Sequence, residues 1–144
     1  MGSPVIDWGR ERGVWWCTMA GPLPWFCVNG YVRLPDDFAP HLRVRLEQLR
    51  RTVGEYSAGQ LDLFDAPGGL TYGLDELGWI GFDTSHAGDV WPDSPPVLVD
   101  LAGRLPPWAR HWTPAMVADE TVHLARQVAQ FAQAQRPGLS DGDA

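Results

Sequence analysis

The segment from Trp112 onward carries the pattern that most constrains the fold, because it predicts a long amphipathic helix. Thr113 is a residue type that caps helix N-termini, and Pro114 suits the first helical position. Trp112 and Val117 are placed to form a hydrophobic staple across that end. One apolar stripe then recurs at helical spacing: Val117, Thr121, Leu124, Val128 and Phe131. Arg136-Pro137-Gly138 ends the helix, whose stripe must be covered by another element.

Two upstream segments, 14–18 and 25–32, have the β-branched and aromatic composition of strands. The turn-like Ala20-Gly21-Pro22-Leu23-Pro24 between them predicts a hairpin. If that hairpin is centred on Pro22, Cys17 lies opposite Cys27. The favoured interpretation is nonetheless a pair of buried reduced thiols, because disulfides are rare in the cytosol.

A second hairpin is predicted between residues 68–73 and 78–83. The paired glycines Gly68 and Gly69 indicate a bulge or a close backbone approach. Residues 41–51 have the apolar spacing of a short helix, although the alternation over 42–46 also fits a strand. Another extended segment is predicted to begin at residues 61–64. Residues 84–111 are predicted to form an ordered loop that is held in place by Trp91 and Trp108.

These elements predict an α+β fold, an antiparallel sheet of about five strands with the long C-terminal helix packed on one face. The 144 residues fit a single domain, expected over residues 1–136, with 137–144 as a frayed polar tail. No apolar run approaches the ~20 residues of a membrane helix. The N-terminus lacks the apolar stretch of a secretory signal, so a cytoplasmic protein is expected.

The charge balance limits which classes of binding partner are expected. A net charge of -7 argues against general binding to phosphate backbones or anionic lipid. The acidic residues are scattered, so mimicry of nucleic acid is not indicated. All 11 basic residues are Arg, whose planar fork suits phosphate and carboxylate, and this leaves room for one Arg-lined pocket for a small anion. Most of the eight Trp are expected in the core, and exposed ones would act as stacking platforms.

The densest polar cluster lies at the end of the strand predicted over residues 78–83. Asp83, His86 and Asp89 recur at every third position, and a tight turn can bring them onto one side. In a functional interpretation His86 is a general base or ligand, and a carboxylate orients its other nitrogen. In the favoured structural interpretation the acids accept backbone N–H groups and His86 donates to a carbonyl. A metal site would need a further ligand from Asp65 or His111, so no metal or cofactor is predicted.

Other catalytic motifs are absent from the sequence. Ser85 adjoins His86 without a nucleophile elbow, and the chain has neither a phosphate-binding glycine loop nor a Cys-x-x-Cys pair. His123, beside the helical stripe, is expected to be solvated or to cap. Arg33 is expected to form a surface ion pair with Asp36 or Asp37, or to project toward a ligand.

Three segments together resemble a family of small, largely uncharacterised phage and prophage proteins. They are Asn-Gly-Tyr-Val at 29–32, Gly-Gly-Leu-Thr-Tyr-Gly at 68–73 and Gly-Trp-Ile-Gly-Phe-Asp-Thr-Ser-His-Ala-Gly-Asp at 78–89. The similar region runs from about Trp15 to Gln133. Asn29 stands where a Cys is common in that family, and Pro67 stands where a His often precedes the glycine pair. If that His belongs to a pair with the position of His86, this chain lacks half of the pair, which favours binding over catalysis.

The resemblance implies a viral accessory gene, and such genes often counter host defence. The predicted function is inhibition by binding, either of a defence protein such as a CRISPR nuclease or of a small nucleotide signal. Trp79 or Trp91 would stack a base, while Arg33, Arg104 or Arg110 would hold phosphate. The predicted binding residues are Trp79, Asp83, His86, Asp89, Trp91, Arg33, Arg104 and Arg110.

Two other interpretations stay open. One is a small nucleotide or phosphodiester hydrolase that uses Asp83, His86 and Asp89, with or without a divalent ion. The other is a structural or self-assembling phage protein with no ligand, and a homo-oligomer fits either case.

Overall fold

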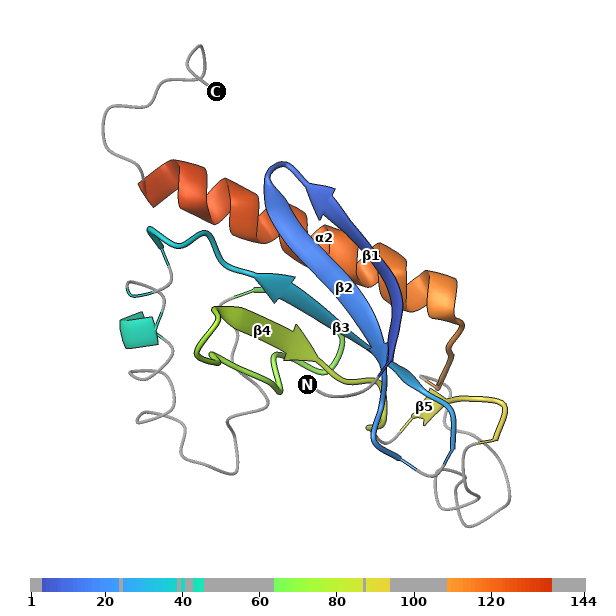
Figure 1. Cartoon of the computed structure of the whole chain (residues 1–144). Coiled ribbons are helices and arrows are strands. Elements are labelled where there is room, and N and C mark those ends of the chain that lie inside the picture. Colours follow the sequence, from blue (N-terminus) through green and yellow to red (C-terminus); the bar gives the residue numbers. More distant parts are fainter. Residues whose placement is uncertain are drawn as a thin grey trace.

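A computed structural model describes residues 4–23, 25–38, 40, 43–45, 64–86, 88–93 and 109–135. Within these, an antiparallel sheet of four strands, in the order β1-β2-β3-β4, packs against one long helix, α2 (Figure 1). The elements are β1 (Val5–Glu11), β2 (Val14–Ala20), β3 (Val28–Arg33), β4 (Trp79–Phe82), β5 (Asp89–Val90), β6 (Arg110–His111) and α2 (Pro114–Gln135). Strands β5 and β6 form a separate parallel pair that was not predicted. The α+β fold is confirmed, with a main sheet slightly smaller than expected.

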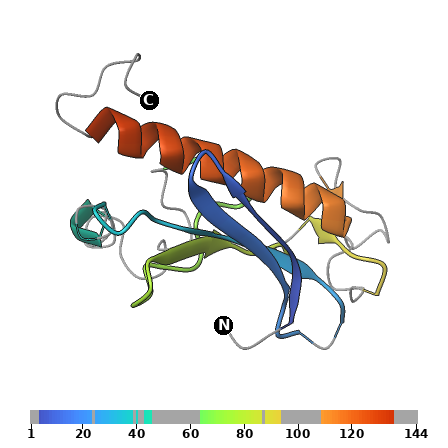
Figure 2. The same cartoon turned by 45° about the horizontal axis from the view of Figure 1, so that its top comes forward.

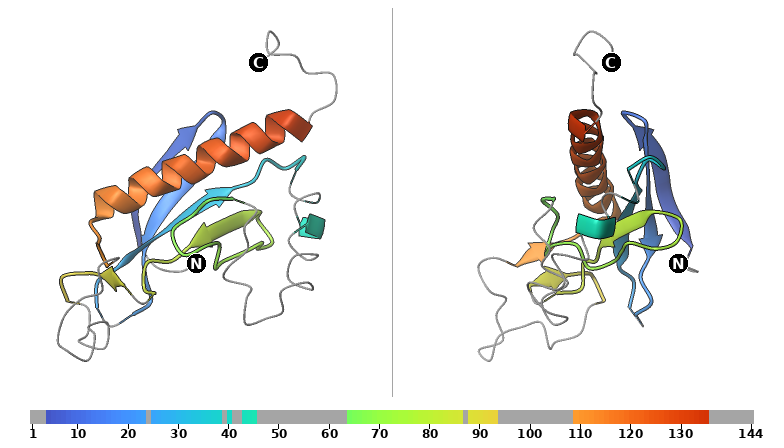
Figure 3. Two further views of the ribbon diagram at one scale, coloured as in Figure 1. Left: turned by 180° about the vertical axis from the view of Figure 1, so that it is seen from behind. Right: turned by 90° about the vertical axis from the view of Figure 1, so that its left-hand side faces the viewer.

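Helix α2 forms where the sequence predicts it. The Thr113 hydroxyl accepts a hydrogen bond from the Met116 N–H at 3.2 Å, which is the expected N-cap. The predicted stripe faces the sheet, and Val117, Thr121 and Leu124 are fully buried. Figure 2 and the side view in Figure 3 show α2 along one face of the sheet, with nothing of the helix on the other face. No helix in the described part of the chain is long and apolar enough to cross a membrane.

The core lies between α2 and the facing side chains of the central strands. Val28 and Val32 of β3 are fully buried there, as are Ile80 and Phe82 of β4. Gly30 allows the helix to come close, because a Cβ at that position would clash with the Thr121 hydroxyl and lie 2.6 Å from the Phe82 ring. The close packing of α2 therefore buries the middle of the helix-side face of the sheet.

Strand β1 was not predicted, although it forms a full hairpin with β2. Arg12 (φ 50°) and Gly13 (φ 83°) make its two-residue turn, and Glu11 pairs with Val14 across it. Positive φ at both central residues is the backbone of a type I′ turn. The strand lies at the edge of the sheet, where it is mostly exposed, so its sequence shows little of the apolar alternation that marks a half-buried strand.

The predicted register of β2 and β3 is wrong. Cys17 pairs with Tyr31, and Cys27 precedes β3 with its carbonyl accepting the Gly21 N–H at 2.9 Å. The connection is longer than a turn centred on Pro22, so the two cysteines do not face each other. Both thiols are free and buried, as the favoured interpretation held, and burial raises the pKa of each.

The second predicted hairpin forms with irregular pairing, in which the bridge between Tyr72 and Gly81 is followed by a hydrogen bond from the Asp75 N–H to the Trp79 carbonyl at 3.2 Å. The close approach predicted at Gly68 is confirmed, because a Cβ there would lie 2.6 Å from Cε1 of His86. Of the predicted helix at 41–51, only 43–45 is described, and it is helical. Residues 61–63, 94–108 and 136–144 lie outside the described residues, and with them Arg104, Trp108, the helix stop and the expected tail.

Candidate functional site

The side chains of Asp83, His86 and Asp89 converge at the turn between β4 and β5. Nδ1 of His86 lies 3.1 Å from Oδ1 of Asp83 and 3.3 Å from Oδ2 of Asp89. The imidazole is 39% exposed, whereas the Asp89 side chain is 15% exposed. The tight turn after β4 therefore brings every third residue onto one side, as the spacing predicted.

Asp89 ties this turn to the end of the sheet–helix core. Its Oδ2 accepts the His86 backbone N–H at 2.9 Å, and its Oδ1 accepts the Trp112 indole N–H at 2.7 Å. Asp83 accepts the backbone N–H of Ser85 at 3.4 Å. These bonds are the backbone-satisfying pattern of the structural interpretation. It was wrong in one respect, since the His86 ring contacts carboxylates instead of a carbonyl.

The cluster has part of a general-base arrangement. Both carboxylates address Nδ1, which fixes the proton there when the ring is neutral and leaves Nε2 as the acceptor. Asp65 lies elsewhere, 3.7 Å from Nε2 of His123, and His111 pairs along β6 with Val90, so neither completes a metal site. Among the described residues no group of three or more His, Cys, Asp or Glu is arranged to hold a metal ion.

The residues predicted to stack a base or to bind phosphate differ in whether a ligand can reach them. Trp91 is 2% exposed, and its indole N–H donates to the Thr84 carbonyl at 3.0 Å, so it offers no platform to a base. This prediction overlooked that an indole in a Pro-rich loop can enter the core. Arg110 pairs with Glu120 at 3.0 Å and lies 4.0 Å over the Trp112 ring. Neither Trp91 nor Arg110 is thus set up for a ligand.

Arg33 and Trp79, by contrast, lie beside each other on open surface. They are paired residues of β3 and β4. Nη2 of Arg33 is 3.4 Å from Oδ1 of Asp36, the ion pair expected from the sequence, and its Nε donates to the Leu77 carbonyl at 3.0 Å. The second bond holds the guanidinium in place over the sheet.

The face of the sheet opposite α2 is a site that sequence reasoning missed. Register places side chains of all four strands on it, and we call it the outer face: Val5, Trp8, Arg10, Trp15, Tyr31, Arg33 and Trp79. Trp8 is 65% exposed and Trp15 39%, with their ring centroids 5.9 Å apart. The signal that would have found it is Trp-Gly-Arg at 8–10, had it been recognised as a strand facing Trp15.

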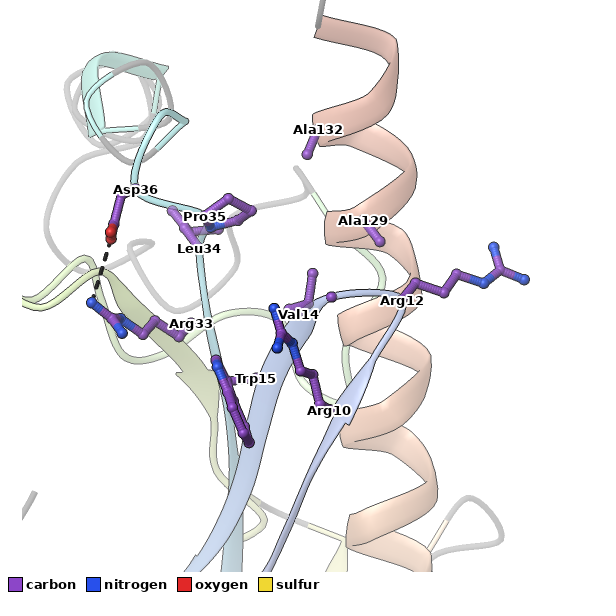
Figure 4. Close-up of a pocket in the computed structure, with 11 residues that line it drawn as sticks. Arg10, Arg12, Val14, Trp15, Arg33, Leu34, Pro35, Asp36, Ala129 and Ala132 are labelled. Carbon is purple, nitrogen blue, oxygen red and sulfur yellow. Dashed lines mark hydrogen bonds and ion pairs between the residues drawn. The ribbon is translucent and has the colours of Figure 1, made fainter. Parts of the chain in front are cut away.

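Two hollows adjoin at the side chains of Trp15 and Arg33. The apolar trough, about 520 Å³, is lined by Val5, Trp8, Trp15, Trp16, Cys17, Met19, Arg33 and Trp79. The arginine hollow, about 440 Å³, lies at the end of the sheet between the β1–β2 turn, residues 34–36 and α2. Figure 4 shows Arg10 and Arg33 on either side of Trp15 in it, while Arg12 extends away past α2. Trp15 and Arg33 line both hollows.

No protein-family model, curated protein or solved structure matches the chain. The function is therefore inferred from the geometry of the cluster and of the outer face.

Proposed function

We propose that this chain is a phage-type accessory protein that acts by binding and inhibits a host-defence protein through its outer face. The observation that carries the proposal is the exposure of Trp8 and Trp15 beside Arg10 and Arg33 on a sheet whose other face is sealed by α2. Trp and Arg are the residue types that dominate binding energy at protein interfaces. An exposed cluster of this kind is typical of an interaction site.

The edge of the sheet adds to this surface. Among the described strands β1 has a neighbour on one side only, and its Val5 and Ile6 are 55% and 42% exposed. The apolar trough continues from β1 across to Trp79. Because the charged side chains of this face are Arg10 and Arg33, a partner with acidic groups at the contact is favoured electrostatically.

The test compares the two candidate sites in a phage-protection assay. We expect Trp8→Ser to abolish inhibition of the host defence, and His86→Ala to retain it, with both variants folded by circular dichroism. Leu77→Ser is the matched control, because Leu77 is also 65% exposed but does not line the trough. Full inhibition by Trp8→Ser, or loss by Leu77→Ser as well, would contradict the proposal.

A nucleotide-signal sponge is the second form of this binding function. It keeps Trp79 and Arg33 from the sequence-based prediction, while Trp91 and Arg110 are engaged elsewhere. A purified defence system distinguishes the two forms. If added signal molecule restores the activity of the defence system, the chain acts as a sponge; if only added defence protein restores it, the chain binds that protein.

Hydrolysis is a second candidate function, favoured by one observation. The His86 ring has Nδ1 held by carboxylates and is 39% exposed, which suits proton abstraction at Nε2. Purified chain should then cleave a phosphodiester, and His86→Ala should lower that rate by about 10²-fold or more. The binding proposal expects no turnover in this assay.

A further inference from the structure

We propose that the arginine hollow and the apolar trough together form a site for a small phosphorylated ligand with a flat ring, of which a mononucleotide is the simplest kind. The phosphate would occupy the arginine hollow, and the ring would lie in the trough against Trp15. This rests on the sponge form of the proposed function, and it adds where on the molecule the signal molecule would bind and to which chemical class it belongs.

The first ground is the charge in the arginine hollow. Arg10 and Arg33 bring two guanidinium groups to its walls, against a single lining carboxylate, that of Asp36. The Asp36 side chain is 91% exposed and 3.4 Å from Arg33, and ion pairs of that kind contribute little to stability. In a chain of net charge -7 this local excess of positive charge is a feature that an anion would complement.

The second ground is that both arginines are held in place before any ligand arrives. Arg33 donates from Nε to the Leu77 carbonyl at 3.0 Å, and the Arg10 guanidinium lies 5.2 Å from the centroid of the Trp15 ring. Side chains that are already ordered lose less conformational entropy on binding. Their remaining N–H groups suit the oxygens of a phosphate, which accepts hydrogen bonds from a guanidinium fork in pairs.

The third ground is the wall that the two hollows share. Trp15 and Arg33 line both, so a ligand can place an anionic group on one side and an apolar group on the other. The trough is lined by Trp8, Trp15 and Trp79, and the rings of Trp8 and Trp15 are inclined to each other at 35°. Indole faces stack on flat heteroaromatic rings, and volumes of about 440 and 520 Å³ are of ligand-pocket size.

The test measures binding of three probes to the purified full chain by isothermal titration calorimetry at low salt. The probes are AMP, adenosine as the ring alone, and inorganic phosphate as the anion alone. We expect AMP to bind at least tenfold more tightly than either part, and raised salt to weaken it. No heat with AMP at millimolar concentration, or adenosine or phosphate binding as tightly as AMP, would overturn the proposal.

Variants locate the site. Arg33→Gln and Trp15→Ala should each weaken AMP binding at least tenfold, whereas Arg110→Gln should leave it unchanged. Arg110 is the matched control, since it precedes the start of α2 and the hollow contacts Ala129 and Ala132 toward the other end of that helix. Unchanged binding in Arg33→Gln would overturn the proposal. No defence protein is present in this assay. Failure to bind AMP would therefore rule out this site, whereas inhibition of a defence protein is tested separately by Trp8→Ser in the phage-protection assay.

Discussion

The two faces of the same four strands have opposite characters. On the helix side Val28, Val32 and Ile80 are 0% exposed, while on the outer face Trp8 is 65% exposed and Trp15 39%. Alternate residues along each strand supply the two faces, so a single stretch such as β2 serves both. The comparison teaches that packing against α2 supplies the stability, which leaves large side chains on the other face available for recognition.

The largest expected effect comes from truncating one residue on each face. Phe82→Ala removes a ring that is 1% exposed under α2 and should lower the free energy of unfolding by about 3–5 kcal/mol. Trp8→Ala should cost at most about 1.5 kcal/mol, the contribution of an exposed aromatic pair. Urea denaturation of both variants measures this, and equal losses would break the distinction between the faces.

The next largest effect is expected in the turn after β4, where Asp89 connects the polar cluster to Trp112. Asp89→Ala leaves the Trp112 indole N–H and the His86 backbone N–H without their acceptor, and should destabilise the fold by about 1–3 kcal/mol. Asp83→Ala is the matched control in the same turn, because its backbone contact is long and its side chain is 35% exposed. Thermal unfolding should separate the two, and a larger loss with Asp83→Ala would show that the turn is held differently.

A pH effect is expected on the outer side, where the Tyr72 ring lies edge-on to Tyr31. The Tyr72 hydroxyl donates to Asp75 at 2.8 Å, and this bond, with burial and the nearby charge, raises the pKa of Tyr72 to about 12. The neutral phenol is therefore favoured by folding, and its stabilisation is complete below the unfolded pKa of about 10 and is lost as the pH rises toward 12. Midpoints of urea unfolding from pH 8 to 12 should fall more steeply for the natural chain than for Tyr72→Phe.

The hydrogen-bonded pair of Tyr72 and Asp75 also affects stability at low pH, through the carboxyl group of Asp75. Burial tends to raise the pKa of Asp75, but N–H donors from Trp79, Leu77 and Gly78 and the Tyr72 hydroxyl outweigh it and lower that pKa. A carboxyl with a lowered pKa stabilises the fold above its unfolded value of about 4 and loses that contribution as the pH falls through the folded value. Asp75→Asn should accordingly flatten the acid side of the stability profile. An unchanged profile would contradict the assignment.

The smallest effect concerns the turn that joins β1 and β2. Arg12 has φ 50°, a conformation that Asn adopts more readily than Arg. Arg12→Asn should raise the free energy of unfolding by about 0.5 kcal/mol, because the strain of positive φ at this position is smaller for Asn. Chemical denaturation of the two chains checks this, and a loss of stability in Arg12→Asn would contradict the assignment of a strained turn.

Helix α2 and its cap could be predicted because their determinants are local. A Thr, a Pro and a stripe of period 3.6 lie within one segment, and the burial of Thr121 and Leu124 follows from that spacing. The register of β2 and β3 could not be predicted in the same way. It depends on the length of the connection, and a shift of that connection moved Cys17 from opposite Cys27 to opposite Tyr31.

The two candidate sites also differ in whether their determinants are local in the sequence. The turn containing Asp83, His86 and Asp89 is local in sequence, and its convergence could be anticipated from spacing. The meeting of Arg10, Trp15 and Arg33 could not, because it requires β1 to pair with β2 and β2 with β3. Trp91 shows the limit of composition, since an indole in a loop is equally suited to the core or to a ligand until its neighbours are known.

The order of residues by itself determined one long capped helix, several strands and an acidic chain whose basic groups are all arginine. Those properties are set by interactions within a few residues, or by composition alone. Only the tertiary structure decided which face of the sheet α2 covers, and hence that Trp8, Trp15 and Arg33 gather on the other. That choice depends on long-range strand pairing, because shifting one strand by a single residue would exchange its two faces.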